Sequence, residues 1–149
     1  MPASSPYIIR MSSSLRTHED YRIGIICALA LEKAAVEAML DEEHPRLNKI
    51  EYDVNDYTLG RIGVHNVAIA CLPAGLLGNG PASIVAKDMI RSFPIKLGLM
   101  VGIGGGVWSK KADIRLGDVV INLKGRMAVL CNGISGRWRR KGYSDVLEH

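Results

Sequence analysis

The amino-acid sequence predicts an α/β fold in which helices cover an open sheet. Three observations carry this prediction: a strand followed at once by a helix over residues 22–39, a second helix over 79–93, and a continuous apolar run over 97–103. Apolar runs without alternation are typical of strands buried on both faces, so we expect the 97–103 strand to lie inside the sheet. Strands that alternate with helices indicate the α/β class.

The composition is that of a soluble globular domain. The chain has 149 residues, of which 48% are hydrophobic and 23% are charged, and its formal net charge is +4. No apolar stretch reaches the roughly 18 residues of a transmembrane helix, so we expect no membrane partner.

The three cysteines predict inert thiols. Cys27 and Cys71 lie in apolar runs, and no C-x-x-C or His-rich spacing accompanies them or Cys131. We therefore expect buried thiols in a reducing, cytoplasmic compartment rather than disulfides or a metal site.

The N-terminal segment reads as a leader. Residues 1–18 hold Arg10, Arg16 and several serines, with no acid before Glu19, which is a weak signature of a mitochondrial transit peptide. One Tyr-Ile-Ile patch gives little amphipathic face, so we predict a disordered leader over residues 1–20.

The first strand and helix begin the ordered region. Residues 22–28 form an apolar run, and the helix after it places five residues at the spacing of one face: Leu31, Ala34, Ala35, Ala38 and Met39. On another face, Lys33 and Glu37 are four residues apart and can pair weakly. Pro45 closes this unit.

Glu32 occupies the first turn of that helix, just past the carboxyl end of the strand. An acid there complements the helix dipole, which is the structural interpretation. It is also a carboxylate at the rim of a sheet, where catalytic groups collect. Position alone favours the structural interpretation.

A hairpin, a loop and a helix follow. Residues 57–72 read as two strands joined by a turn at 63–66, with His65 an exposed turn residue. The Gly- and Pro-rich loop after Leu72 leads to a helix with Asn79 or Gly80 as N-cap and Pro81 at its first position. Its apolar stripe comprises Ala82, Val85, Ala86, Met89, Ile90 and Phe93, and Pro94 ends it. The loop either presents N–H donors to an anion or polar group or serves only as a connection.

The apolar run at 97–103 ends in a glycine cluster, Gly102, Gly104, Gly105 and Gly106. Ligands bind outside the carboxyl ends of strands in such sheets, so we expect a site here, with a tight turn as the alternative. The cluster is no dinucleotide fingerprint, because Val107 stands where the last glycine belongs and no amphipathic helix follows. The sequence also lacks a Walker A motif, a nucleophile elbow and zinc-ligand spacing.

The C-terminal part, residues 123–149, is basic. A polar connection leads to a short strand at 119–121, and six basic residues with no acid among them follow: Lys124, Arg126, Arg137, Arg139, Arg140 and Lys141. Such a run could contact nucleic acid, but no recognition fold frames it. We predict a solvated, poorly ordered tail and no nucleic-acid partner.

Three blocks together indicate a family. They are the strand and Ala-Leu-Ala-Leu-Glu at residues 23–32, the loop at 75–81, and Gly-Leu-Met-Val-Gly-Ile-Gly-Gly-Gly-Val with its sequel Ala-Asp-Ile-Arg-Leu-Gly-Asp-Val-Val at 112–120. The chain resembles the nucleoside phosphorylase/nucleosidase superfamily, a purine and uridine phosphorylase-like domain of its fungal branch. The resemblance covers the N-terminal half of that domain, residues 21–122 here.

The resemblance implies a three-layer α/β/α sandwich around a mixed central sheet, as in phosphorylase/hydrolase-like folds. Its members cleave the N-glycosidic bond of purine-type nucleosides with phosphate or water, and use no metal or organic cofactor. Longer forms would be homo-oligomers or fused to signalling domains. The implied catalytic residue is Glu32, which would position the attacking water. The implied substrate-binding residues are Ala28, Gly75, Gly78, Asn79, Gly102, Gly104 and Gly105.

Two departures qualify this expectation. Met100 and Ile103 stand where phosphorylases of the bacterial type carry an Arg and a Ser that bind phosphate, so we expect hydrolysis rather than phosphorolysis. The family's later half, with the ribose-binding Glu and the Asp that acts as acid toward the base, has no counterpart after Ile121. We therefore expect a truncated domain with exposed sheet edges and an incomplete catalytic site. A non-catalytic nucleoside-binding or signalling module is the alternative.

Overall fold

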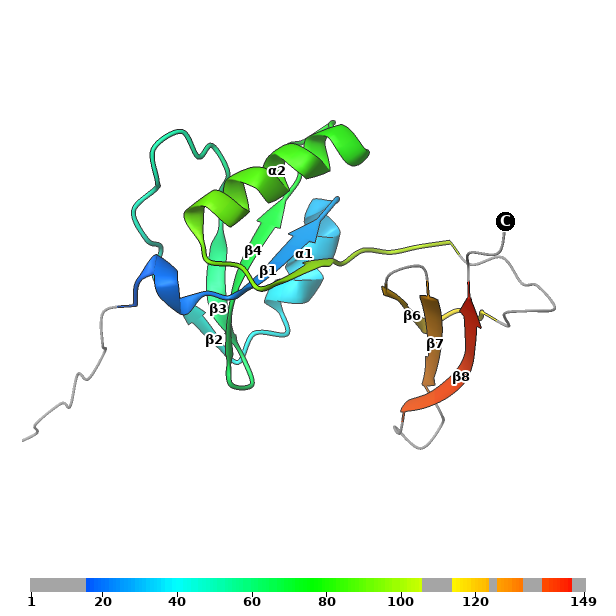
Figure 1. Ribbon diagram of the computed structural model, residues 1–149. Coiled ribbons are helices and arrows are strands. Elements are labelled where there is room, and N and C mark those ends of the chain that lie inside the picture. The colour runs from blue at the N-terminus through cyan, green and yellow to red at the C-terminus, as the bar shows by residue number, and fades with distance from the viewer. Residues whose placement is uncertain (1–15, 106–113, 124–125, 133–137, 146–149) are drawn as a thin grey trace, which may run out of the picture. The chain divides into compact units, whose positions relative to one another are not determined.

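The computed structural model describes residues 16–105, 114–123, 126–132 and 138–145 (Figure 1). The chain divides into two compact units, Met1–Ile103 and Gly104–His149. The predicted leader up to residue 15, Gly106 and the basic residues Lys124 and Arg137 lie outside the described residues. In the described part, no helix is long and apolar enough to cross a bilayer.

The first unit is built on a mixed five-stranded sheet in the order β2-β3-β4-β1-β5. Strand β1 is parallel to both β4 and β5, whereas β3 is antiparallel to β2 and β4. The sheet and its helices comprise β1 (Ile23–Cys27), α1 (Ala30–Glu37), β2 (Glu42–His44), β3 (Thr58–Ile62), β4 (His65–Cys71), α2 (Asn79–Ser92) and β5 (Leu97–Met100), after a short 3-10 helix, η1 (His18–Asp20).

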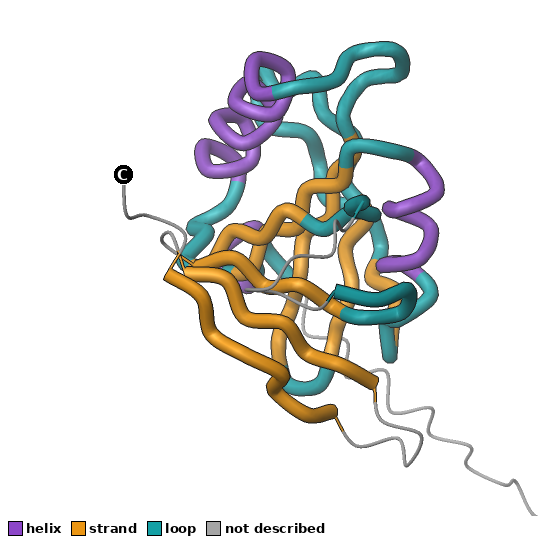
Figure 2. Tube along the Cα trace, turned by 90° about the vertical axis from the view of Figure 1, so that its right-hand side faces the viewer, coloured by secondary structure: helices purple, strands orange, loops and turns teal. Residues whose placement is uncertain are grey.

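The two helices lie on opposite faces of this sheet (Figure 2). Side chains alternate along β4, so Ala68 and Ala70 join the buried cluster with α2, and Val67 and Ile69 join the cluster with α1. The α/β class predicted from the sequence is therefore confirmed, with a mixed sheet and one helix on each face.

Several predicted elements are confirmed with shifted boundaries. The first strand, the hairpin and the second helix form, and Ala82, Val85 and Met89 are buried. Pro81 is the third residue of α2 rather than the first, because Gly78 is the N-cap. Ile90 was predicted in the apolar stripe but is 63% exposed.

The predicted apolar face of α1 is wrong. Leu31 is 71% exposed and Met39 68% exposed, whereas Glu32 and Val36 are the buried residues of the helix. An alanine-rich helix has apolar residues on every side, so its composition does not fix its rotation. Hydrogen bonds of Glu32, described below, turn the opposite face toward the sheet.

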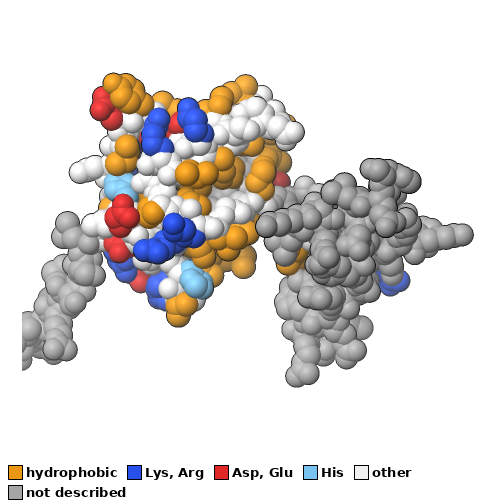
Figure 3. Space-filling model, viewed as in Figure 1, with side chains coloured by type: hydrophobic (Ala, Val, Ile, Leu, Met, Phe, Trp, Pro, Cys, Tyr) orange, Lys and Arg blue, Asp and Glu red, His pale blue; other side chains and the backbone are white. Residues whose placement is uncertain are grey.

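The predicted burial of the 97–103 strand is also wrong. Strand β5 ends at Met100 and lies at the edge of the sheet, and all four of its residues are exposed. Its apolar residues are exposed on both faces and along one edge, because no described strand pairs with its outer side. Figure 3 shows hydrophobic side chains gathered on the side of the first unit that faces the viewer.

The opposite edge of the sheet is polar, and the strand that forms it, β2, was not predicted from the sequence. Strand β2 contains only Glu42, Glu43 and His44, a pattern without strand periodicity, and it pairs with β3. His44 is 4% exposed, and its Nδ1 is 2.9 Å from the Tyr21 hydroxyl. Its Nε2 has no hydrogen-bond partner and lies 3.8 Å from Glu42 Oε1.

The second unit contains an antiparallel sheet in the order β6-β7-β8. Its strands are β6 (Val119–Leu123), β7 (Arg126–Asn132) and β8 (Trp138–Asp145). The predicted strand at 119–121 is confirmed within β6. The prediction of a poorly ordered tail is wrong for the backbone of β7 and β8, where an apolar run at 127–131 supplies a strand. The absence of a nucleic-acid partner stays a prediction.

The buried His44 predicts a pH-dependent stability. Burial is the main cause that lowers the pKa of His44, and Arg16 adds to it. The folded state therefore binds fewer protons than the unfolded state between the lowered pKa and the ordinary value near 6.5. The contribution of neutral His44 to the free energy of unfolding is fully present above about pH 6.5. It is lost as the pH falls through the folded pKa of His44.

We expect the urea midpoint to fall between pH 7 and 5, with His44 contributing at most about 1.4 kcal/mol per pH unit. His44→Gln should flatten this slope, whereas His65→Gln, at an exposed position, should leave it unchanged. Equal slopes in the native chain and the His44 variant would contradict the assignment.

Candidate functional site

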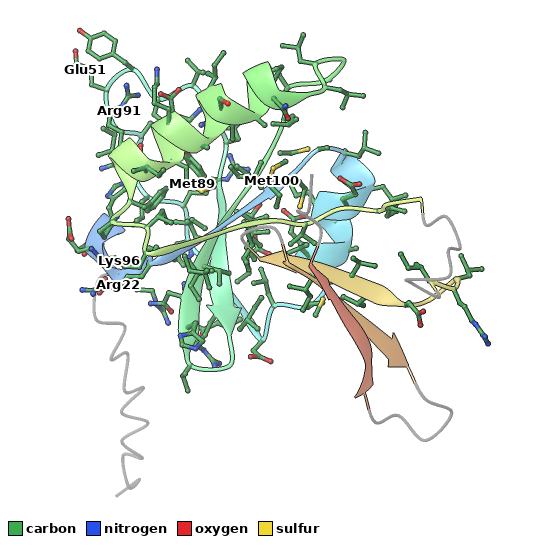
Figure 4. All side chains as sticks on the ribbon, turned by 45° about the vertical axis from the view of Figure 1, so that its right-hand side comes forward. Arg22, Glu51, Met89, Arg91, Lys96 and Met100 are labelled. Carbon is green, nitrogen blue, oxygen red and sulfur yellow. The ribbon has the colours of Figure 1, made fainter. Side chains whose placement is uncertain are left out.

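The candidate site lies at the carboxyl edge of the first sheet. Strands β4, β1 and β5 are parallel, so the segments that follow Cys71, Cys27 and Met100 leave the sheet at the same edge. Figure 4 shows Met100 at this end of β5, and Arg22 beside Lys96 at the opposite end. Pairing continues one residue past β5, where the Val101 N–H donates to the Ile26 carbonyl at 3.0 Å.

Glu32 connects two of these segments through backbone hydrogen bonds. Its Oε2 accepts from the N–H groups of Ala28 at 3.0 Å and Leu29 at 2.9 Å, both in the turn between β1 and α1. Its Oε1 accepts from the N–H of Ile103 at 2.8 Å, in the segment after β5. The side chain is buried, with 6% of its surface exposed.

These donors keep the Glu32 carboxyl ionised. The N–H of Ile103 is the largest cause that lowers its pKa, followed by the N–H of Leu29, while desolvation acts in the opposite direction. A carboxylate has two oxygens with about four acceptor positions, and the three N–H groups occupy three of them. The remaining position is on Oε1, so this oxygen can accept one further hydrogen bond.

Part of this arrangement caps the helix. Leu29 is the N-cap of α1 and Glu32 is its third residue, so the bond from the Leu29 N–H to Glu32 is the half of a capping box that the third residue supplies, and Leu29 has no side-chain acceptor for the other half. The bond to Ile103 lies outside this motif, because it reaches 71 residues along the chain. Capping explains the bond from Leu29 to Oε2, and the bond from Ala28 to Oε2 belongs to the same local turn. The long-range bond from Ile103 to Oε1 has neither explanation.

Glycine at position 102 allows the backbone to pass close to Glu32. A Cβ built on Gly102 would lie 2.8 Å from Glu32 Oε1 and 3.1 Å from its Cδ. Such distances are too short for a side chain, so the absence of one lets the backbone pass directly beside the carboxylate. Gly98 on β5 differs, because a Cβ there would meet nothing within 4 Å.

The structure brings together only some of the predicted site residues. Ala28, Glu32 and Gly102 meet at the carboxylate, and the contribution of Ala28 is its backbone N–H. Gly75 and Gly78, with φ of +80° and +98°, and Asn79 follow β4 at the same edge, but none of the three Glu32 hydrogen bonds reaches them. Gly104 and Gly105 belong to the second compact unit.

The backbone donors of Leu29 and Ile103 were missed by the sequence analysis. Any residue can donate a backbone N–H, so these two positions carry no sequence signal. The position of Ile103 after a strand and between glycines was the available clue. Among the described residues, no group of three or more His, Cys, Asp or Glu side chains could hold a metal ion.

A second buried polar cluster lies away from this edge, near the C-terminal end of α2. The Asp53 carboxylate accepts from the Asn55 N–H at 2.9 Å, the Tyr57 hydroxyl at 2.8 Å and the Ser92 hydroxyl. A cavity beside it is lined by these four residues and by the rings of His18 and Phe93, among others. All three donors are neutral and internal, and Ser92 belongs to α2, so we assign the cluster to fixing the 46–57 loop against α2.

Comparison with known proteins gives one similarity over part of the chain. A protein of Hyaloscypha variabilis described as a nucleotide-binding leucine-rich repeat (NLR)-like protein is 47% identical over 112 residues. The match covers 74% of this chain and 11% of the relative, so the chain spans about a tenth of that protein's length. No protein-family model and no solved structure matches the chain.

The fit of Gly102 against Glu32 gives a direct test of the site. We expect Gly102→Ala to push the carboxylate away from the Ile103 N–H, lowering the urea midpoint and raising the Glu32 pKa toward its ordinary value. Carboxyl NMR titration measures this pKa, and Gly98→Ala is the matched control on β5. An unchanged Glu32 pKa in Gly102→Ala would show that Ile103 does not hold the carboxylate.

Proposed function

We propose that this chain is part of a nucleoside phosphorylase-like domain in which Glu32 positions water for cleavage of the N-glycosidic bond of purine-type nucleosides. The observation that carries the proposal is the buried Glu32 carboxylate, fixed by three backbone N–H groups at the carboxyl edge of the sheet. The resemblance of residues 23–32, 75–81 and 112–120 to that superfamily supplies the reaction.

The geometry of Glu32 suits a group that orients a nucleophile. Its lowered pKa keeps it an acceptor at neutral pH, so it can take a proton from water but has none to donate to a leaving base. The open acceptor position on Oε1 is where a water O–H would bind. That water would attack the anomeric carbon as the bond to the base breaks and an oxocarbenium-like sugar develops.

Hydrolysis fits this edge better than phosphorolysis. Met100 and Ile103 are 69% and 76% exposed and carry no group that binds an anion. The one hydrogen-bond donor of Ile103, its backbone N–H, already donates to Glu32. Water needs no such anion site, because one acceptor orients it.

We further propose that the complete domain is a three-layer α/β/α sandwich and that this chain supplies only part of its catalytic site. One helix on each face of the mixed sheet supports the layered architecture. The exposed edge strand β5 and the exposed apolar residues of α1 support the presence of further partners for this sheet. The acid that protonates the base would come from the later half of the domain, so full catalysis is not expected from this chain.

A non-catalytic nucleoside-binding or signalling module is the second candidate. The capping bond from the Leu29 N–H to Glu32 favours it, because capping explains that donor without catalysis. The description of the relative as a nucleotide-binding, NLR-like protein also favours a module within a longer signalling protein. The two candidates differ in whether base is released.

Release of free base under single-turnover conditions distinguishes them. With the full chain in excess over a panel of purine nucleosides, we expect slow, phosphate-independent release of base. Glu32→Gln should reduce the rate by about 100-fold or more, which is typical of losing a positioned proton-transfer group. Glu51→Gln, at an exposed position in the 46–57 loop, is the matched control and should keep the native rate.

The other outcomes of the base-release experiment also bear on the two candidates. Nucleoside binding without base release would favour the second candidate, and neither binding nor release would reject both. Release that requires phosphate would contradict hydrolysis. Equal rates for the native chain and a folded Glu32→Gln variant would remove Glu32 from the mechanism.

A further inference from the structure

Two cysteines end neighbouring parallel strands beside the candidate site. Cys27 and Cys71 are the last residues of β1 and β4, and they are register partners. The Leu72 N–H donates to the Cys27 carbonyl at 3.0 Å, so the strands are still hydrogen-bonded at this point. Neighbouring strands lie about 4.8 Å apart, which is within the range of Cα separations that a disulfide spans.

Both side chains project from the same face of the sheet. Cys27 belongs to the buried cluster on the α1 side, together with Ile69 of β4. Cys71 is two residues after Ile69, so alternation along the strand places its Cβ on that side as well. The Cys71 thiol is also among the groups that raise the pKa of Cys27, as expected for close neighbours.

The two thiols differ in access to solvent. Cys27 has no exposed surface, whereas Cys71 is partly exposed. Burial is the main cause that raises the pKa of Cys27 to about 11, so it remains a thiol at neutral pH. A soluble oxidant therefore reaches Cys71 first, and Cys27 is the nearest group that can react with the product.

We propose that Cys27 and Cys71 form a redox modification site, in which hydrogen peroxide oxidises Cys71 and Cys27 then closes an intramolecular disulfide between β1 and β4. The site is independent of the proposed enzymatic function. It also departs from the sequence-based prediction of inert thiols, because the two cysteines are register partners on neighbouring strands.

The chemistry balances in two steps. The Cys71 thiolate attacks one peroxide oxygen, an S–O bond forms, the O–O bond breaks, and the departing hydroxide is protonated to water, leaving a sulfenic acid. The Cys27 sulfur then attacks the Cys71 sulfur, the S–S bond forms, the S–O bond breaks, and the hydroxyl leaves as water with the Cys27 proton. Overall, two thiols are oxidised, and one peroxide is reduced to two waters.

The ends of the strands permit the closure. A disulfide needs its Cβ atoms about 3.8 Å apart, which is closer than neighbouring parallel strands hold them. Both cysteines are terminal in their strands, so we expect this approach to move the strand ends together with the segments that follow them. Turns follow both positions, toward Glu32 after Cys27 and toward Gly75 after Cys71.

Thiol counting in the full chain tests the proposal. Cys131→Ser removes the third cysteine, so the proposed pair supplies the only two thiols of the chain. After peroxide treatment, denaturation and alkylation, we expect loss of both alkylatable thiols and a mass lower by two hydrogens, on a monomer in a non-reducing gel. Dithiothreitol should restore both thiols, and peptide mapping should identify a Cys27–Cys71 bridge.

Dimedone and the single-cysteine variants assign the order of reaction. Dimedone present during oxidation should label Cys71 in the Cys131→Ser chain, which requires no change in the core. Cys27→Ser in that background should leave Cys71 oxidised without a bridge, and Cys71→Ser should leave Cys27 alkylatable.

Three results would overturn the proposal. They are Cys71 sulfinic acid with Cys27 still alkylatable in the two-cysteine chain, a covalent dimer in place of the intramolecular bridge, and dimedone labelling of Cys27 instead of Cys71.

Discussion

The carboxylate of Glu32 is the interaction on which the described site depends. Two N–H groups from the turn after β1 and one from the segment after β5 converge on it. Burying a carboxylate without such donors would cost free energy of folding. Without the carboxylate, the N–H groups of these segments would have no shared acceptor. The same bonds direct Glu32 and Val36 toward the sheet, and so set the rotation of α1. The position of Gly102 follows, since a side chain there would occupy the space of the carboxylate.

This arrangement joins a structural role and a proposed chemical role in one side chain. Backbone donors hold Glu32 ionised and in place, which is the preorganisation that a water-positioning group needs. The same donors would serve a module that only caps a helix and binds a nucleoside. The acceptor position left on Oε1 distinguishes the two roles, because only the catalytic role needs a water bound there. The exposed apolar edge at β5 lies next to this position and contrasts with the polar edge at β2, whose charged residues discourage strand pairing.

The sequence predicts those elements that local patterns determine. Apolar runs give β1 and β4, and Pro94 correctly marks the end of α2. Burial of β5 could not be predicted, because an apolar run does not reveal whether neighbours cover it. Strand β2 depends on pairing with Arg61 and its neighbours in β3 rather than on its own residues. In the site, Glu32 was identified, but Leu29 and Ile103 act through backbone N–H groups that leave no pattern in the sequence.

Hydrogen exchange at the Ile103 amide tests most directly whether Glu32 joins these two segments, because the Ile103 N–H donates the long-range hydrogen bond to Glu32. In the full chain near pH 7, we expect the Ile103 amide to exchange slowly compared with an unprotected amide, and Glu32→Ala to remove the protection. Protection should persist in Glu51→Ala, since Glu51 is exposed and outside the site. Exchange of the native Ile103 amide at the unprotected rate would contradict the central claim that Glu32 joins the turn after β1 to the segment after β5.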